Sequence, residues 1–311
     1  MNAFSLASSS VIVVVIVRRP SSSSARVSSN VENMSSVVRR VVVFGGNGYV
    51  GAAISRALVE SDAWMTTATG NGTGTASTST STSTSAPRVA VACASRSGAP
   101  PTWARRERWV ERVEWVTCDA LDAETCETTT RDADAVVTAI GALPMPWMGR
   151  EEIARLNGDT NVVPGRAAMM NGTTRLVVVG ATIPPLVPGL AAYARGKALA
   201  ETFARDEFAC VDEGRSAVVL RPATVSGTRR VGGGVSLPLS LVMDPARVVL
   251  RATGSAAALA HAPVPLENVA RAAARAALDF ECETFDRGFS VVSNASLITE
   301  DYYNLLKRKP A

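Results

Sequence analysis

The sequence predicts an α/β protein built on a doubly wound parallel sheet. Three observations lead to this fold class: short apolar runs alternate with helical segments, a glycine-rich turn joins the first run to the first helix, and the runs are apolar without interruption. Uninterrupted apolar runs are typical of strands that are buried on both faces of a parallel sheet and joined by helical crossovers. The 311 residues are enough for one large domain of this kind.

Residues 1–40 differ in composition from the rest of the chain. They contain twelve serines, five arginines and one acidic residue, Glu32, and therefore have a charge of +4. This composition is typical of an organelle transit peptide, whereas in a secretory signal peptide the arginines would precede the apolar run at 11–17. We expect a disordered leader at 1–40, a folded domain at 41–311, and a location in the mitochondrial matrix or at the inner-membrane periphery. The chloroplast is the alternative.

Charge and hydropathy exclude several classes of function. The whole chain also has a charge of +4, so the residues after the leader are neutral overall and offer no basic surface for nucleic acid. No apolar run approaches the roughly 20 residues of a membrane span, so we expect no transmembrane segment, while peripheral membrane association stays open. The single histidine, His261, and the spacing of the five cysteines give no metal cluster.

The predicted elements follow in order after the leader. Residues 66–87 form an uncharged Ser/Thr-rich insertion between the first helix and the second strand, which we expect to be disordered. A helix at 266–278 and an apolar run at 288–292 are expected in a small C-terminal cap at about 228–311. The other expected strands cover 40–44, 88–94, 114–117, 135–140, 176–179 and 217–220, and the other helical segments lie around 50–58, 151–170 and 190–208.

The glycine-rich turn predicts a dinucleotide site. Gly45, Gly48 and Gly51 lie between the first strand and the first helix, which is the setting of the Rossmann fold. Glycines there allow a tight turn and a close approach of the backbone to a pyrophosphate at the helix N-terminus. The candidate cofactor contacts in the turn are Gly45, Asn47, Gly48, Tyr49, Val50 and Gly51.

The end of the second strand predicts which cofactor is bound. NAD-binding sites usually place an acidic residue there for the ribose 2′-hydroxyl, but this strand ends at Ser95 and Arg96. A guanidinium and a hydroxyl suit a 2′-phosphate, so NADP(H) is favoured over NAD(H). Asp119, after the third strand, could accept from the adenine amino group or cap the next helix.

The fourth and fifth strands lead into the expected reaction site. Small residues at Ala139, Ile140 and Gly141 would let the nicotinamide half of the cofactor pass over the sheet edge. After the fifth strand, Tyr193 and Lys197 are four residues apart in a helical segment, so both side chains lie on one face. A nearby ammonium lowers the pKa of a phenol, and tyrosine can then act as general acid or base on a carbonyl or alcohol.

These features together resemble the extended or atypical branch of the short-chain dehydrogenase/reductase superfamily of NAD(P)-binding Rossmann proteins. The glycine turn, Asp119, Tyr193 with Lys197, and the segment 220–227 that contains Pro222 follow the order of that family. The resemblance places Pro222 among the cofactor contacts, and the ammonium of Lys197 can also hold the cofactor ribose. More narrowly, the segments 45–51, 95–98, 156–161, 221–230 and 262–270 are similar to an organellar group related to the Rossmann-type accessory subunit of respiratory complex I and to a coenzyme Q biosynthesis factor.

The resemblance implies a bound NADP(H) and a link to quinone metabolism. The first hypothesis is an NADP-dependent oxidoreductase or isomerase. In this hypothesis Tyr193 and Lys197 are the acid/base pair, and the substrate is a small molecule or a quinone. The second is a non-catalytic protein that holds NADPH within a respiratory or ubiquinone-synthesis complex. A sugar-nucleotide epimerase or dehydratase is the third, although few residues remain for a substrate lobe.

One departure from the family pattern bears on activity. Active members usually have a serine or threonine at the end of the fifth strand, where this chain has Gly180. Thr182 is the only hydroxyl close by and is the candidate third catalytic residue, since a missing donor to the substrate oxygen would cost about 10²-fold or more. Asn157, on the preceding helix, is a candidate cofactor contact and a candidate support for Lys197 through water.

Overall fold

The computed structural model describes residues 38–61, 88–183, 189–210, 214–230, 236–238, 248, 255–279 and 288–299. The expected insertion at 66–87 and all but the last three residues of the expected leader at 1–40 lie outside the described residues.

The core of the fold is a seven-stranded sheet in which every pair of neighbouring strands is parallel. The strand order is β11-β6-β5-β4-β1-β2-β3, so the chain runs outward from β1 in one direction and then returns to run outward in the other. This arrangement confirms the doubly wound Rossmann fold. The strands are β1 Val38–Phe44, β2 Arg88–Ser95, β3 Val113–Thr117, β4 Ala135–Thr138, β5 Arg175–Val179, β6 Ser216–Leu220 and β11 Gly288–Val292.

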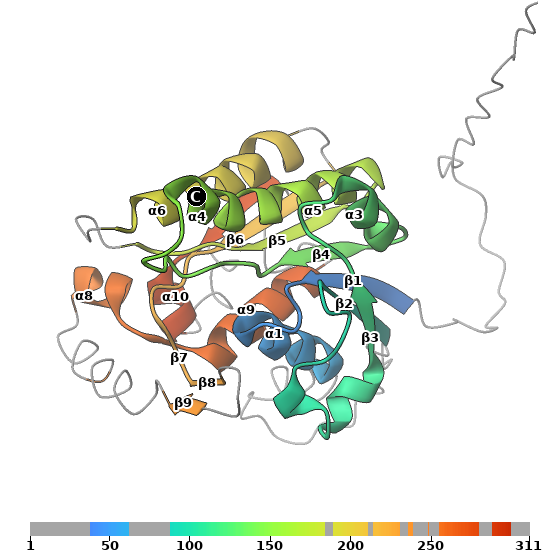
Figure 1. Cartoon of the computed structure of the whole chain (residues 1–311), viewed down its shortest axis with the longest axis horizontal. Coiled ribbons are helices and arrows are strands. Elements are labelled where there is room, and N and C mark those ends of the chain that lie inside the picture. The colour runs from blue at the N-terminus through green and yellow to red at the C-terminus, as the bar shows by residue number, and fades with distance from the viewer. Residues whose placement is uncertain are drawn as a thin grey trace, which may run out of the picture. The chain divides into compact units, whose positions relative to one another are not determined.

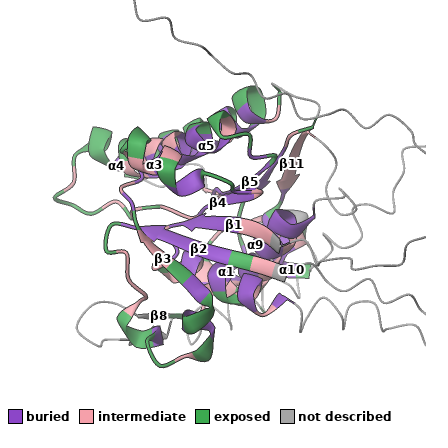
Figure 2. Ribbon diagram, turned by 90° about the vertical axis from the view of Figure 1, so that its right-hand side faces the viewer, coloured by how far each residue is buried: buried purple, intermediate pink, exposed green. Residues whose placement is uncertain are grey.

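Helices cover both faces of this sheet (Figure 1). One face holds α1 Tyr49–Val59 and α9 Leu266–Leu278. The other holds α3 Ala123–Thr130, α4 Arg150–Asn157, α5 Asp159–Met170 and α6 Ala191–Thr202. Figure 2 shows the result: buried strands in the middle and exposed residues on the outward sides of the helices.

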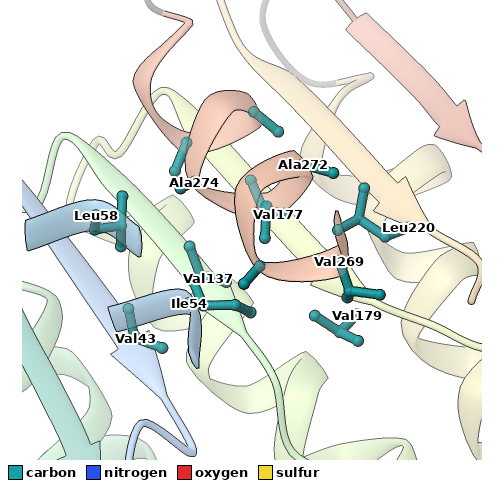
Figure 3. Close-up of a cluster of buried hydrophobic side chains, with 14 of the residues drawn as sticks. Val43, Ile54, Leu58, Val137, Val177, Val179, Leu220, Val269, Ala272 and Ala274 are labelled. Carbon is teal, nitrogen blue, oxygen red and sulfur yellow. The ribbon is translucent and has the colours of Figure 1, made fainter. Parts of the chain in front are cut away.

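Residues that alternate along each strand divide into two cores. Val43, Val137 and Val177 face α1 and α9, where Figure 3 shows them beside Ile54 and Val269. Their neighbours Val42, Val136 and Val178 face the opposite helices. Since burying a valine side chain contributes about 1.5–3 kcal/mol, strands that are apolar on both faces stabilise both layers.

Two elements that we expected in the C-terminal cap belong to the main sheet and its helical layer. β11 is the edge strand beside β6, and α9 packs against α1 with alanines that are fully buried. The predicted bounds of the helix at 266–278 and of the strand at 288–292 are confirmed. Their apolar patterns, however, do not indicate which layer of the fold they join. The remaining C-terminal elements are β7 Val225–Ser226, β8 Thr228–Arg230, β9 Ser236–Pro238, α8 Ala256–His261, β10 Val264–Pro265 and α10 Asn294–Thr299.

The first strand begins at Val38, before residue 41, where we expected the folded domain to start. Arg39, counted with the leader, forms an ion pair with Asp134 at 3.2 Å. Arg40 donates its backbone N–H to the same carboxylate at 2.8 Å and its guanidinium to the carbonyls of Thr129 and Arg131. These two arginines are therefore part of the fold.

Within the described residues, no helix combines the length and the apolar character that a bilayer span requires.

Candidate active site

The glycine turn has the geometry of a dinucleotide site. Gly45 has φ +79° and donates its N–H to the Ala94 carbonyl at 2.9 Å, which joins the turn to the end of β2. A Cβ at Gly51 would overlap the Gly45 carbonyl, and one at Gly46 would lie 2.6 Å from the Cys93 sulfur. Only glycine fits these positions, because α1 starts directly against the turn and Cys93 of β2 lies against Gly46.

The N-terminus of α1 is open to an anion. Gly48 is the residue before the helix, no side chain caps the helix end, and its first turn, which begins with Tyr49 and Val50, contains no acidic residue. The first N–H groups of the helix and its dipole therefore favour a pyrophosphate. Together with the glycine cradle, this fits the phosphates of a dinucleotide.

Polar side chains from three segments meet at the ends of β2 and β3. Asn47 donates to the Ser97 hydroxyl at 3.0 Å, and this hydroxyl lies 3.3 Å from that of Ser95. Arg96 and Asp119 form an exposed ion pair with a distance of 3.2 Å between Nε and Oδ2. The link between Asn47 and Ser97 was not predicted, since it depends on how closely the glycine turn approaches the loop after β2.

Asp119 does not cap the helix that follows it. The N-cap of α3 is Asp122, whose side chain accepts from the Glu124 N–H at 3.1 Å. Asp119 instead accepts from the Leu121 N–H at 3.0 Å and pairs with Arg96. Of its two predicted roles, only the one at the cofactor remains.

Lys197 connects α6 to two strands of the sheet. Its Nζ donates to the carbonyls of Ile140 and Val179, both at 2.9 Å, at the carboxyl ends of β4 and β5. The side chain is buried, and burial lowers its pKa to about 8. Ala139 and Ile140 belong to the segment that leaves β4, and Ala139 is held by a hydrogen bond from its N–H to the Phe44 carbonyl at 3.0 Å.

Tyr193 lies one turn before Lys197 on α6 and is partly buried. We expected the ammonium to lower the pKa of the phenol, but the pKa of Tyr193 is raised, because burial disfavours its charged form. The tyrosine therefore keeps its proton at neutral pH.

Thr182 is held by the segment after β6. Its hydroxyl donates to the Arg221 carbonyl at 2.7 Å, and its N–H donates to the Pro222 carbonyl at 2.7 Å. The hydroxyl proton that would bind a substrate oxygen is therefore engaged. At Gly180 a Cβ would lie 3.1 Å from the Leu220 carbonyl, so a side chain there would crowd β6.

Asn157 holds the loop after β4, and its support of Lys197 through water stays a prediction. It is fully buried, donates to the carbonyls of Ala142 at 2.9 Å and Ile153 at 2.8 Å, and accepts from the Ala142 N–H at 3.1 Å. Gly141 separates it from Lys197: a Cβ at Gly141 would lie 3.1 Å from Asn157 Oδ1 and 3.3 Å from Lys197 Nζ. A side chain at Gly141 would thus crowd Asn157 and Lys197 on one side of this exposed glycine.

Two signals beside this site were missed. Asn161 is buried and donates to the Ile140 carbonyl at 3.2 Å, the same oxygen that Lys197 uses. Composition also singles out the lysine: of the 32 Lys and Arg residues only Lys197, Lys307 and Lys309 are lysines. A chain that otherwise uses arginine and has a lysine here indicates a site that needs a compact, titratable ammonium.

Comparison with known proteins supports the fold. No family model matches the chain. It is 30% identical over 209 residues to an uncharacterized chloroplastic protein of Arabidopsis thaliana, in an alignment that covers 66% of this chain and 57% of the relative. The chain thus spans little more than half the length of that relative.

Solved structures with similar folds include a short-chain dehydrogenase/reductase from Serratia marcescens, with a TM-score of 0.54 and 16% identity over 83% of this chain and 98% of that one. A 3-oxoacyl-[acyl-carrier protein] reductase from Brucella melitensis in complex with NAD has a TM-score of 0.55 and 14% identity, over 84% and 97% of the two chains. A UDP-N-acetylglucosamine 4-epimerase from Methanobrevibacter ruminantium has a TM-score of 0.52 and 17% identity, over 83% and 77%. At these identities the likeness shows that the fold is shared.

Proposed function

We propose that this chain, which has the Rossmann fold of short-chain dehydrogenase/reductases and related epimerases, is an NADP(H)-dependent oxidoreductase that reduces a carbonyl or quinone. The observation that carries the proposal is Lys197: a buried lysine one helical turn from Tyr193, bound to the carboxyl ends of β4 and β5. In open α/β sheets ligands bind at this edge, near the point where the strand order reverses.

The choice of NADP(H) rests on Arg96 and Ser95. The segment after β2 offers a guanidinium and two hydroxyls, and no carboxylate at the position where NAD-binding sites have one. Asp119 occupies a single edge of the guanidinium, through Nε, and thereby orients Arg96. The glycine turn and the N-terminus of α1 would hold the pyrophosphate, and Arg96 would hold the 2′-phosphate. Pro222 and Gly141 would lie along the nicotinamide half of the cofactor.

The residues at the sheet edge suit reduction. A bound NADPH would supply a hydride. Tyr193 keeps its proton at neutral pH and can donate it to the substrate oxygen as negative charge develops there. Lys197 has a third N–H donor for the cofactor ribose or the Tyr193 oxygen, and Thr182 would contribute once its hydroxyl leaves the Arg221 carbonyl.

An apolar loop beside this edge supports an apolar substrate such as a quinone. It follows Ala142, the residue that Asn157 holds, and contains Leu143, Met145 and Trp147, which are 50%, 41% and 79% exposed. Exposed apolar side chains that gather in one short loop are typical of a surface that binds something apolar. The loop also suits peripheral contact with a membrane or with a quinone-synthesis complex.

The chloroplast is the location we now favour. The leader composition predicted an organelle and preferred the mitochondrion, whereas the relative from Arabidopsis thaliana is chloroplastic. Fusion of residues 1–37 to a fluorescent protein tests this choice: we expect import into plastids, and import into mitochondria would overturn it.

Titration of the full-length protein with NADPH and NADH tests the proposed function. We expect NADPH to bind at least tenfold more tightly and to support reduction of a quinone, with loss of about 10²–10⁴-fold in rate in Tyr193→Phe. A chain that binds neither nucleotide would contradict the proposal.

A non-catalytic role in which NADPH is held as a structural element is the second candidate. It is favoured by Gly180 at the usual hydroxyl position and by the engaged hydroxyl of Thr182. Tyr193→Phe separates the two candidates in a strain that lacks the protein: full complementation together with NADPH binding supports the structural role, and lost complementation supports catalysis.

A further inference from the structure

The face of α6 that carries Tyr193 and Lys197 continues to a third residue at the same spacing, Glu201. This carboxylate is largely buried and binds the Arg221 guanidinium through both of its oxygens. The Nε of Arg221 donates to Oε2 at 2.9 Å, and Nη2 donates to Oε1. A bidentate pair of this kind fixes direction as well as distance.

The backbone of Arg221 holds the other side of the site. Its carbonyl accepts the Thr182 hydroxyl, and the next carbonyl, that of Pro222, accepts the Thr182 N–H, both at 2.7 Å. Its own N–H donates to the Val292 carbonyl of β11 at 2.9 Å. One residue therefore connects the helix of the acid/base pair to the threonine across the sheet edge.

We propose that Glu201 and Arg221 are positioning residues that set the distance between Thr182 and the pair formed by Tyr193 and Lys197. This inference rests on the proposed oxidoreductase function. Among the described residues Lys197 ties α6 to the ends of β4 and β5, and the pair of Glu201 and Arg221 supplies the corresponding tie to the segment after β6.

The expected effect is on rate and much less on stability. Partly exposed ion pairs contribute little to folding, whereas a misplacement of about 1 Å in an active site can cost about 100-fold in rate. The chain offers a matched control on the same helix: Arg195 pairs with Glu151 of α4 at 2.7 Å, and both side chains are exposed.

The test compares Glu201→Gln, Arg221→Gln, the double variant and the control Arg195→Gln in the full-length protein. We expect each of the first two to lower kcat for quinone reduction at least tenfold, with the NADPH Kd unchanged within twofold. The double variant should lose no more than either single variant, because the two residues act as a pair. Additive losses, or equal losses in Arg195→Gln, would overturn the inference.

A readout without turnover comes from the three lysines of the chain. With ¹³C-labelled lysine, the Cε resonance of Lys197 should shift when NADPH saturates the wild-type protein. In Glu201→Gln that shift should fall by at least half, whereas Arg195→Gln should keep it. If the wild type reduces no quinone or carbonyl, the proposed reaction is wrong, and the Lys197 resonance still tests the positioning role. If Glu201→Gln has the same NADPH-induced shift and the same kcat as the wild type, the positioning role alone is wrong.

Discussion

Lys197 donates a hydrogen bond of 2.9 Å to the carbonyl oxygen of Val179, the last residue of β5. A second bond of the same length reaches the Ile140 carbonyl beyond β4. The ammonium thus replaces water by two backbone carbonyls at neighbouring strand ends. Since neither partner is charged, the charged form of the lysine is poorly compensated for its burial.

This burial predicts how stability depends on pH. The pKa of Lys197 falls from 10.5 to about 8 on folding, so the unfolded chain binds the proton more tightly. Stability should therefore be lost as the pH falls from 10.5 towards 8, by up to roughly 3 kcal/mol. Urea unfolding of wild type and Lys197→Met at several pH values measures this. The difference in unfolding free energy between wild type and Lys197→Met should change between pH 8 and 10.5. A difference that is independent of pH would contradict the prediction.

Arg96→Ala should weaken NADPH binding by about 1.5–3 kcal/mol, the loss of a charge-assisted hydrogen bond, and leave NADH binding nearly unchanged. Isothermal titration of both nucleotides measures the two constants. Arg106→Ala, which removes another exposed arginine, is the control and should affect neither nucleotide. Equal losses for NADPH and NADH in Arg96→Ala would remove the argument for a 2′-phosphate site.

Gly51→Ala should abolish dinucleotide binding. The new methyl group would overlap the Gly45 carbonyl, so α1 has to move away from the turn. Overpacking of this kind also costs about 1–3 kcal/mol of stability. Thermal unfolding with and without NADPH reports both effects. Gly149→Ala adds the same methyl group in open space and should bind normally; retained binding in Gly51→Ala would place the cofactor elsewhere.

Trp147→Ser should raise the KM for a quinone with a decyl chain at least tenfold and leave that for a quinone without a chain unchanged. The reason is that 79% of the tryptophan is exposed in the apolar loop after β4. Met170→Ser is the control. Met170 is similarly exposed, at 68%, but it is the last residue of α5, which leads to the amino end of β5 and not to the carboxyl ends of the strands. Equal changes for both quinones would show that the loop does not select the apolar chain.

Local patterns were enough for much of this site. The glycine turn and the spacing of Tyr193 and Lys197 are encoded within a few residues, and the structure has the turn against the end of β2 and Lys197 against the ends of β4 and β5, while their roles stay predictions. The pKa of Tyr193 could not be predicted in the same way, because it depends on how far the folded chain buries the phenol.

Contacts between segments that are distant in the chain could not be predicted from the sequence. Thr182 meets Arg221 because β5 and β6 pair in one register, and Asn157 meets Ala142 because α4 folds back on the loop that precedes it. Likewise, the apolar run that became β11 is compatible with an edge strand or a cap, and only its pairing with β6 decides.

The early start of β1 limits where the predicted leader could be removed. Val38, Arg39 and Arg40 pair with Arg88, Val89 and Ala90 of β2, and Asp134 binds both arginines. We expect a peptidase that removed this predicted leader to cut before Val38, because a cut after Arg40 would remove paired residues from an inner strand of the sheet. The N-terminus of such a mature chain, read by mass spectrometry, should therefore lie at or before residue 38.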